Sequence, residues 1–135
     1  MAAQARSHTV TRMSHLARTA ELMRMAPDVY GAALAAARDA RAAAGVTERV
    51  LGRAAGESVV APRDALVERA ILTAVRGVPA PCFEVMPQPG RDAVALARLA
   101  GYSADRVARS LELRVDEVKS SMLHALRSAA LQGTS

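Results

Sequence analysis

Four of the six prolines of this chain lie in one short segment, residues 77–90, and no other feature limits its fold as strongly. Proline lacks a backbone amide hydrogen and its ring clashes with the preceding helical turn, so no regular helix is expected to cross this segment. The sequence therefore predicts a helical region in residues 1–76, a proline-rich connection in residues 77–90 and a second helical domain in residues 91–135.

The residues on either side of this segment favour helices. Hydrophobic residues make up 51% of the chain, many of them alanine, which is the best helix former, whereas aromatic residues make up only 2%. Few candidate strands remain, so the predicted fold class is all-α. The spacing of apolar residues predicts seven helices, at residues 9–25, 29–44, 48–55, 62–76, 91–100, 104–111 and 116–131.

Five residues set the predicted boundaries of the N-terminal helices. Pro27 is expected to end the first helix, and the Asp28 carboxylate to cap the second. Gly45 is expected to end that second helix, and the Thr47 hydroxyl to cap a short third one. Pro62 suits the first turn of the fourth helix.

The chain is basic, with a net charge of +5 and a pI of about 10.6. A basic surface favours polyanions, of which nucleic acid is the usual one. The first 20 residues contain three arginines and no acid, which fits either a mitochondrial presequence or a basic arm. The single cysteine excludes a disulfide framework, and no apolar stretch is long enough to cross a bilayer, so we expect an intracellular protein without membrane contact.

Residues 101–126 fit a helix-turn-helix, which needs a short helix, a tight turn and a second helix that crosses the first steeply. Ser103 is a suitable cap for the first of these helices. The apolar residues recur every three or four positions, so we expect them to form one buried face. They are Val107, Ala108 and Leu111 in the first helix, Leu113 and Val115 in the turn, and Val118, Met122, Ala125 and Leu126 in the second helix.

The opposite face of the second helix is polar, as expected of a helix that enters the major groove of DNA. Lysine donates to guanine, and serine bonds to several base edges. The residues expected to read bases are Lys119, Ser120, Ser121 and His124. The residues expected to contact phosphates, and so to make the affinity depend on salt, are Arg106, Arg109, Arg114 and Arg127. The alternative is a polar face that contacts only solvent.

Residues 86–127 resemble region 4 of the sigma-70 family, especially its extracytoplasmic-function group. The family pattern opens with Leu-Pro, here Met86-Pro87, and with a helix that ends in Gly-hydrophobic-Ser, here residues 101–103. It continues with an acidic-hydrophobic-Ala helix and a Leu-Gly-Ile-Ser turn, here residues 105–114. It closes with Thr-Val-Lys-Ser-Arg-Leu, here residues 117–122. The match has no gap and covers about a third of the chain.

Three positions depart from the family pattern. Ser121 replaces the usual arginine, Arg114 replaces the usual capping serine, and Ala97 replaces an arginine of the first helix. Asp116 is expected to take over the cap, because a carboxylate accepts the free amide hydrogens at a helix start. The resemblance implies double-stranded promoter DNA at the −35 element and the RNA polymerase flap as partners. It also implies a bacterial protein of the cytoplasmic nucleoid.

Residues 1–85 do not resemble sigma region 2, which melts DNA with aromatic side chains; this part of the chain contains only two aromatic residues. We therefore predict a sigma-like transcription regulator, or one subunit of a split sigma factor, that contacts promoter DNA and RNA polymerase. The N-terminal helices are expected to bind a second regulatory protein or to dimerise. The alternative is an interaction module that docks on RNA polymerase or another regulator without binding DNA.

Nothing in the sequence indicates an enzyme, a cofactor or a metal site. The three histidines lack metal-ligand spacing, and no glycine-rich loop is followed by Lys-Ser or Lys-Thr. Cys82 is expected to be a small buried hydrophobic residue and not a nucleophile. Met13, Met23 and Met25 are expected in the core; the alternative is a methionine stripe that binds another helix.

Overall fold

The computed structural model describes the backbone of residues 2–77 and 80–133, and the side chains of residues 15–77 and 80–132. Within these ranges the protein is all-α, as predicted, and contains no strand. The described helices are α1 (Ala2–Ala37), α2 (Ala40–Ala55), α3 (Arg63–Arg76), α4 (Pro81–Glu84), α5 (Gly90–Leu99), α6 (Ala104–Leu111) and α7 (Val115–Gly133).

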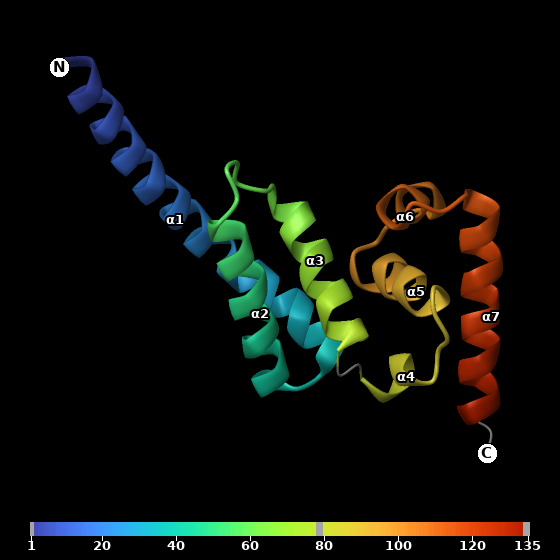
Figure 1. Cartoon of the computed structure of the whole chain (residues 1–135). Helices are drawn as coiled ribbons and strands as arrows, with labels where there is room; N and C mark the ends of the chain where they lie inside the picture. The colour runs from blue at the N-terminus through green and yellow to red at the C-terminus, as the bar shows by residue number, and fades with distance from the viewer. Residues whose placement is uncertain (1, 78–79, 134–135) are drawn as a thin grey trace.

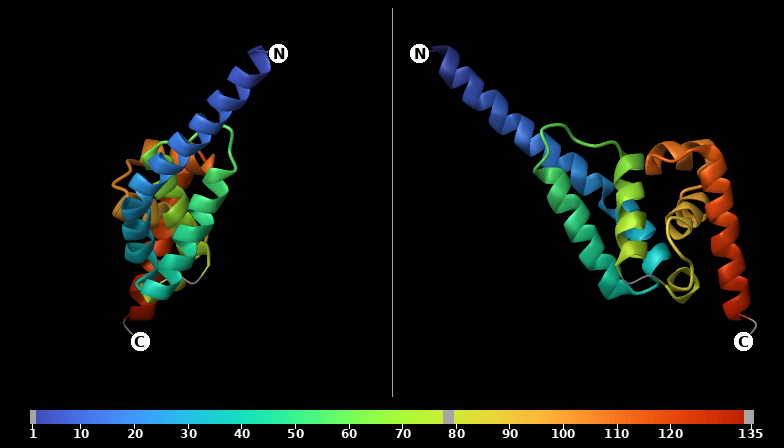
Figure 2. Two further views of the ribbon diagram at one scale, coloured as in Figure 1. Left: turned by 90° about the vertical axis from the view of Figure 1, so that its left-hand side faces the viewer. Right: turned by 45° about the vertical axis from the view of Figure 1, so that its right-hand side comes forward.

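The helices form two groups that meet where α3 contacts α5 (Figure 1). α1, α2 and α3 pack against one another, and α7 packs against α5 and α6. α5 lies between α3 and α7 and contacts both, so it joins the two groups. The N-terminal half of α1 extends well beyond α2 and α3 (Figure 2).

One cluster of buried apolar side chains runs through both groups. Among its largest members are Leu66, Ile71 and Val75 in α3 and Val94 and Leu96 in α5. Burial of each such side chain stabilises a fold by about 1.5–3 kcal/mol, so α3 and α5 each contribute a substantial part of the core. The predicted division at residues 77–90 falls between the end of α3 and the start of α5. That the two parts are separate domains stays a prediction.

The prediction that Pro27 ends a helix was wrong, because α1 continues through Pro27 to Ala37. A proline inside a helix costs about 3 kcal/mol. Beyond Pro27, the side chains of Val29, Ala33 and Ala36 are fully buried, and α1 packs on both α2 and α3. This packing offsets the cost of the proline. Asp28 therefore caps no helix; its carboxylate instead accepts a 2.8 Å bond from Arg63 of α3.

The predicted helix boundary at Gly45 and Thr47 was also wrong, because both lie inside α2. The chain breaks earlier: Asp39 caps α2 by accepting a 3.0 Å bond from the Ala42 amide. The Thr47 hydroxyl donates to the Ala43 carbonyl oxygen, one turn back in the same helix. A glycine inside a helix costs only about 1 kcal/mol, and one buried stripe (Ala43, Val46, Val50 and Ala54) spans Gly45.

The proline-rich segment contains one short helix, α4, which the sequence did not predict. Pro81 is its first residue, where the missing amide hydrogen has no intrahelical role. Phe83 and Met86 are buried and fix this segment to the core. The prediction that Cys82 is buried was wrong: the neighbouring Phe83 takes the inward position, and Cys82 is exposed.

Candidate nucleic-acid interface

The predicted helix-turn-helix segment consists of α6, a turn at residues 112–114 and α7. The predicted cap is confirmed, since the Ser103 hydroxyl oxygen accepts the Arg106 amide at 3.3 Å. α6 ends at Glu112, whose φ of 56° lies in the left-handed region. The Leu113 amide then donates to the Ala108 carbonyl oxygen at 2.9 Å and closes the turn. These element lengths are those that a helix-turn-helix needs.

Most residues of the predicted apolar face are buried or partly buried, as expected. Val107, Ala108, Val118 and Ala125 are buried. The partly buried members, which pack against the core, are Leu111, Leu113, Val115 and Met122. The prediction for Leu126 was wrong, because this side chain is 43% exposed. Leu126 lies outside the buried stripe of α7 that contains Val118 and Ala125.

α5 and α7 approach each other closely at Gly90. A methyl group at Gly90 would overlap the Ser121 carbonyl oxygen and lie 2.7 Å from the Ala125 Cβ. Gly90 is itself buried, so the absence of a side chain allows this contact between the two helices. The contact covers one side of Ser121, which is only half-exposed, whereas we had expected it on the outer polar face.

The prediction that Asp116 caps α7 was wrong. The helix begins at Val115, so Asp116 lies inside its first turn, and the Arg114 amide donates to the Glu117 carboxylate at 3.3 Å. The Asp116 carboxylate accepts a 2.9 Å bond from the Arg114 guanidinium. This bond lowers the pKa of Asp116 and raises the pKa of Arg114. Arg114, a predicted phosphate contact, is therefore already paired within its own turn.

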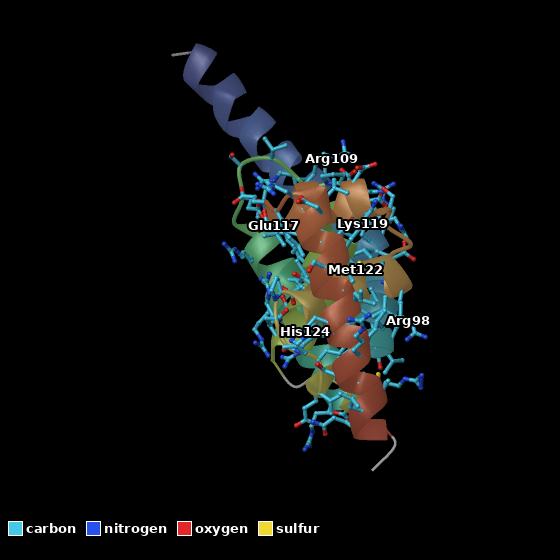
Figure 3. The ribbon with its side chains drawn as sticks, turned by 90° about the vertical axis from the view of Figure 1, so that its right-hand side faces the viewer. Arg98, Arg109, Glu117, Lys119, Met122 and His124 are labelled. Atoms are coloured by element: carbon cyan, nitrogen blue, oxygen red, sulfur yellow. The ribbon has the colours of Figure 1, made fainter. Side chains whose placement is uncertain are left out.

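The remaining predicted base-reading residues lie on the outer face of α7. Lys119, Ser120 and His124 are exposed, and Figure 3 shows Lys119 and His124 on opposite sides of the helix. Arg127 on α7 and Arg109 on α6 are exposed as well. None of these five side chains forms a hydrogen bond or ion pair within the part of the chain that the structure describes. They are available to a ligand.

Arg106, which was predicted to contact a phosphate, instead points toward α3. Its guanidinium lies 4.0 Å above the ring of Tyr102 and forms a 3.4 Å ion pair with Asp64 of α3. A second polar contact joins the same helices, because the Ser110 hydroxyl donates to Glu68 at 2.5 Å. Burial and then the charge of Glu68 raise the pKa of Tyr102. α6 is thus fixed to α3 through the side on which Arg106 lies.

Sequence reasoning missed Arg98, which is exposed on α5 and lies on the same side of α7 as Lys119 (Figure 3). A signal was present, because Arg98 directly follows Ala97, the position where the family pattern has an arginine. It also missed three exposed leucines on α7, which are Leu123, Leu126 and Leu131.

No cluster of three or more His, Cys, Asp or Glu side chains suited to a metal ion occurs among the residues described. None of the described helices has the length and apolarity needed to cross a membrane. Comparisons with protein-family models, with curated proteins and with solved structures give no match.

Proposed function

We propose that this protein is a sigma-like transcription regulator that binds promoter DNA through the outer face of α7. One observation supports this proposal above all: Lys119, Ser120 and His124 are exposed and unpaired, while the opposite face of the same helix is buried. A recognition helix needs this division, because its inner face must be held rigidly while its outer face reaches base edges.

The phosphate contacts belong to the arginines around α7. Arg109 and Arg127 are exposed and unpaired within the described chain, and Arg98 is exposed on the same side of α7 as Lys119 (Figure 3). Arg114 would bring little net charge, since Asp116 and Glu117 balance it. Arg106 would have to leave Asp64 and Tyr102 to reach a phosphate. We therefore expect Arg98, Arg109 and Arg127 to contribute most to salt-dependent affinity.

The proposed partners include RNA polymerase and a second regulatory protein. The proposed location is therefore the bacterial nucleoid. Leu16 on the projecting half of α1 is 65% exposed and Met23, further along the helix, is 66% exposed, whereas Met25 is packed against the core. Large exposed apolar side chains on a projecting helix are suited to a helical partner. Met23 therefore favours the methionine-stripe alternative, and Met13 lies outside the described side chains.

The test measures DNA affinity as a function of salt. The Lys119→Ala/Arg109→Ala double variant should bind a promoter duplex at least tenfold more weakly and lower the slope of log affinity against log salt by about one, because Arg109 is the phosphate contact and Lys119 reads bases. The matched control is Arg24→Ala/Arg41→Ala, which removes two exposed arginines from α1 and α2 and should bind as the unaltered protein does. No salt-dependent affinity for any duplex would refute DNA binding.

The exposed leucines of α7 favour a second candidate function, a module that docks on polymerase without DNA. Leu123 and Leu126 lie one helical turn apart and are 49% and 43% exposed, so they offer apolar surface to a protein partner. Capture of RNA polymerase from nuclease-treated lysate distinguishes the candidates. If Leu123→Ser/Leu126→Ser abolishes capture while Lys119→Ala/Arg109→Ala does not, and no duplex binds, the docking function replaces the first proposal.

A further inference from the structure

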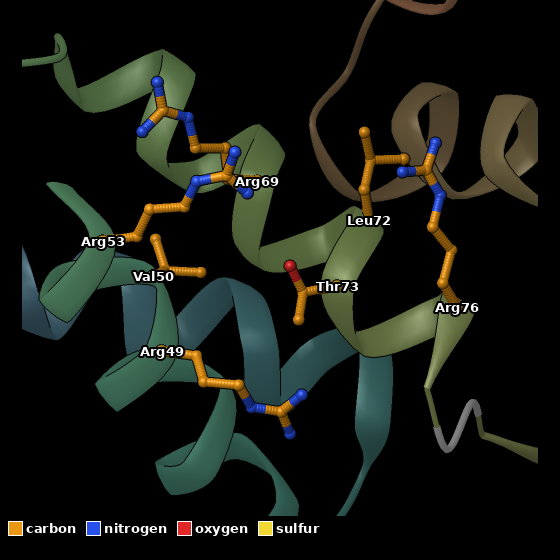
Figure 4. A pocket seen from close by; sticks show the side chains of 7 residues that line it. All are labelled: Arg49, Val50, Arg53, Arg69, Leu72, Thr73 and Arg76. Atoms are coloured by element: carbon orange, nitrogen blue, oxygen red, sulfur yellow. The ribbon is translucent and has the colours of Figure 1, made fainter. Parts of the chain in front are cut away.

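A pocket between α2 and α3 is bordered by four arginines and has a volume of about 390 Å³ (Figure 4). Arg49 and Arg53 extend into it from α2, and Arg69 and Arg76 come from α3. Pockets for small molecules usually have volumes of about 300–1,000 Å³, so this one is large enough for such a ligand. It is separate from the proposed DNA-binding face on α7.

The four arginines are not equivalent. Arg69 forms an ion pair with Glu57, and Arg76 forms one with Asp92. Arg49 and Arg53 make no hydrogen bond or ion pair in the described chain, although the positive charge of Arg53 helps to lower the pKa of Glu57. Two positive charges therefore face the pocket without a carboxylate of their own. An anion of charge close to −2 would balance them.

The rest of the pocket is apolar apart from one hydroxyl group. Val50 and Leu72 contribute hydrocarbon surface, and the Thr73 hydroxyl points into the space between the helices (Figure 4). A ligand that fills the pocket must therefore join a doubly charged group to a weakly polar body. Guanidinium groups bind phosphate through two parallel hydrogen bonds and also stack on flat rings.

We propose that this pocket binds a small phosphate monoester that carries a flat ring, which is the chemistry of a nucleoside monophosphate. A phosphate monoester has a charge of about −1.5 to −2 at pH 7, which matches the two unpaired guanidinium groups. Each phosphate of a DNA backbone is a diester with one charge. The bases of a duplex are stacked inside it, so no ring is free to contact Val50 and Leu72. The small anion is thus the better match to the pocket.

The experiment is calorimetric titration of the full chain, in the absence of divalent cations, with AMP, adenosine, inorganic phosphate and a duplex with hydroxyl ends. AMP should bind, phosphate should bind more weakly, and adenosine should not bind detectably. Arg49→Gln/Arg53→Gln should weaken AMP binding by about tenfold or more, because each change removes a charged hydrogen-bond donor. Both side chains are exposed, so we expect the thermal unfolding of this variant to be unchanged.

The control variant is Arg24→Gln/Arg41→Gln, which removes the same charge outside the pocket and should leave AMP binding unchanged. Absence of AMP binding, or equal loss in both variants, would overturn the proposal. If inorganic phosphate bound as tightly as AMP, the ring would contribute nothing to affinity, and that result would contradict the proposed ligand class. Duplex affinity that is lost in Arg49→Gln/Arg53→Gln would make the pocket part of a nucleic-acid surface instead. A failure of DNA binding by α7 affects none of these outcomes.

Discussion

Arg76 at the end of α3 and Asp92 at the start of α5 form an ion pair, in which one carboxylate oxygen accepts a 2.9 Å hydrogen bond from the guanidinium Nε and lies 2.7 Å from Nη2. The other Asp92 oxygen accepts a 2.8 Å bond from the Gln88 amide. The Asp92 side chain is only 7% exposed, whereas that of Arg76 is 56% exposed. The pair therefore links the two helical groups across the proline-rich segment, with its negative end inside the protein.

We expect Arg76→Ala to lower the free energy of unfolding by about 1–3 kcal/mol, because it leaves a buried carboxylate with Gln88 as its remaining side-chain partner. The matched control is Arg63→Ala, whose partners Asp28 and Asp64 are exposed, and which should cost at most about 1 kcal/mol. Urea unfolding measures both. Equal losses in the two variants would show that the burial of Asp92 does not matter.

Gly90→Ala should destabilise the protein by about 1–3 kcal/mol, because its methyl group has no space between the Ser121 carbonyl and Ala125. Gly52→Ala is the matched control, since it lies inside α2 and a methyl group there meets nothing within 4 Å. That change should stabilise the protein by about 0.5–1 kcal/mol. Thermal unfolding should therefore shift in opposite directions, and shifts of the same sign would contradict the geometry at Gly90.

Glu112→Gly should raise the free energy of unfolding by about 1 kcal/mol. Glu112 adopts a φ of 56°, which glycine reaches without the steric cost that a side chain incurs. Glu112→Ala separates this effect from the loss of charge, since alanine keeps the Cβ and should give no such gain. Chemical denaturation of both variants is the measurement. A stability of Glu112→Ala equal to that of Glu112→Gly would assign the gain to charge.

The ion pair at the start of α7 predicts a dependence of stability on pH. Because Arg114 holds the pKa of Asp116 below its ordinary value, the pair stabilises the folded state above the unfolded pKa of about 4. That contribution is lost as the pH falls through the folded pKa. NMR titration of the Asp116 carboxyl should show its pKa rising in Arg114→Gln. An unchanged pKa would mean that Arg114 does not bond to Asp116 in solution.

The sequence predicted the C-terminal helices well because local signals there agree. Ser103 is followed by an apolar stripe, and both features require α6 to begin where it does. In the N-terminal part, local signals opposed tertiary packing. Pro27 and Gly45 are helix breakers by themselves, but burial against α2 and α3 outweighs them.

The sequence predicted those features of the candidate site that depend only on which side chains of a helix are exposed. The helical period placed Lys119, Ser120 and His124 on the outer face of α7. It did not reveal that Arg106 meets Asp64, which lies 42 residues earlier, because only the tertiary fold, in which α5 packs on both α3 and α6, brings them together. The pocket between α2 and α3 was missed for the same reason.

Pro27 has one further consequence for the long helix α1. Because proline has no amide hydrogen, the Met23 carbonyl oxygen lacks the donor that the fourth residue along a helix normally supplies. The backbone ladder of α1 is therefore interrupted at this point. Side chains on the N-terminal side of the break still hold the helix to the rest of the protein, because Leu22 is buried and Arg18 donates to the Glu57 carbonyl oxygen. The two parts of α1 are thus kept in line by separate tertiary contacts and not by one continuous run of backbone hydrogen bonds.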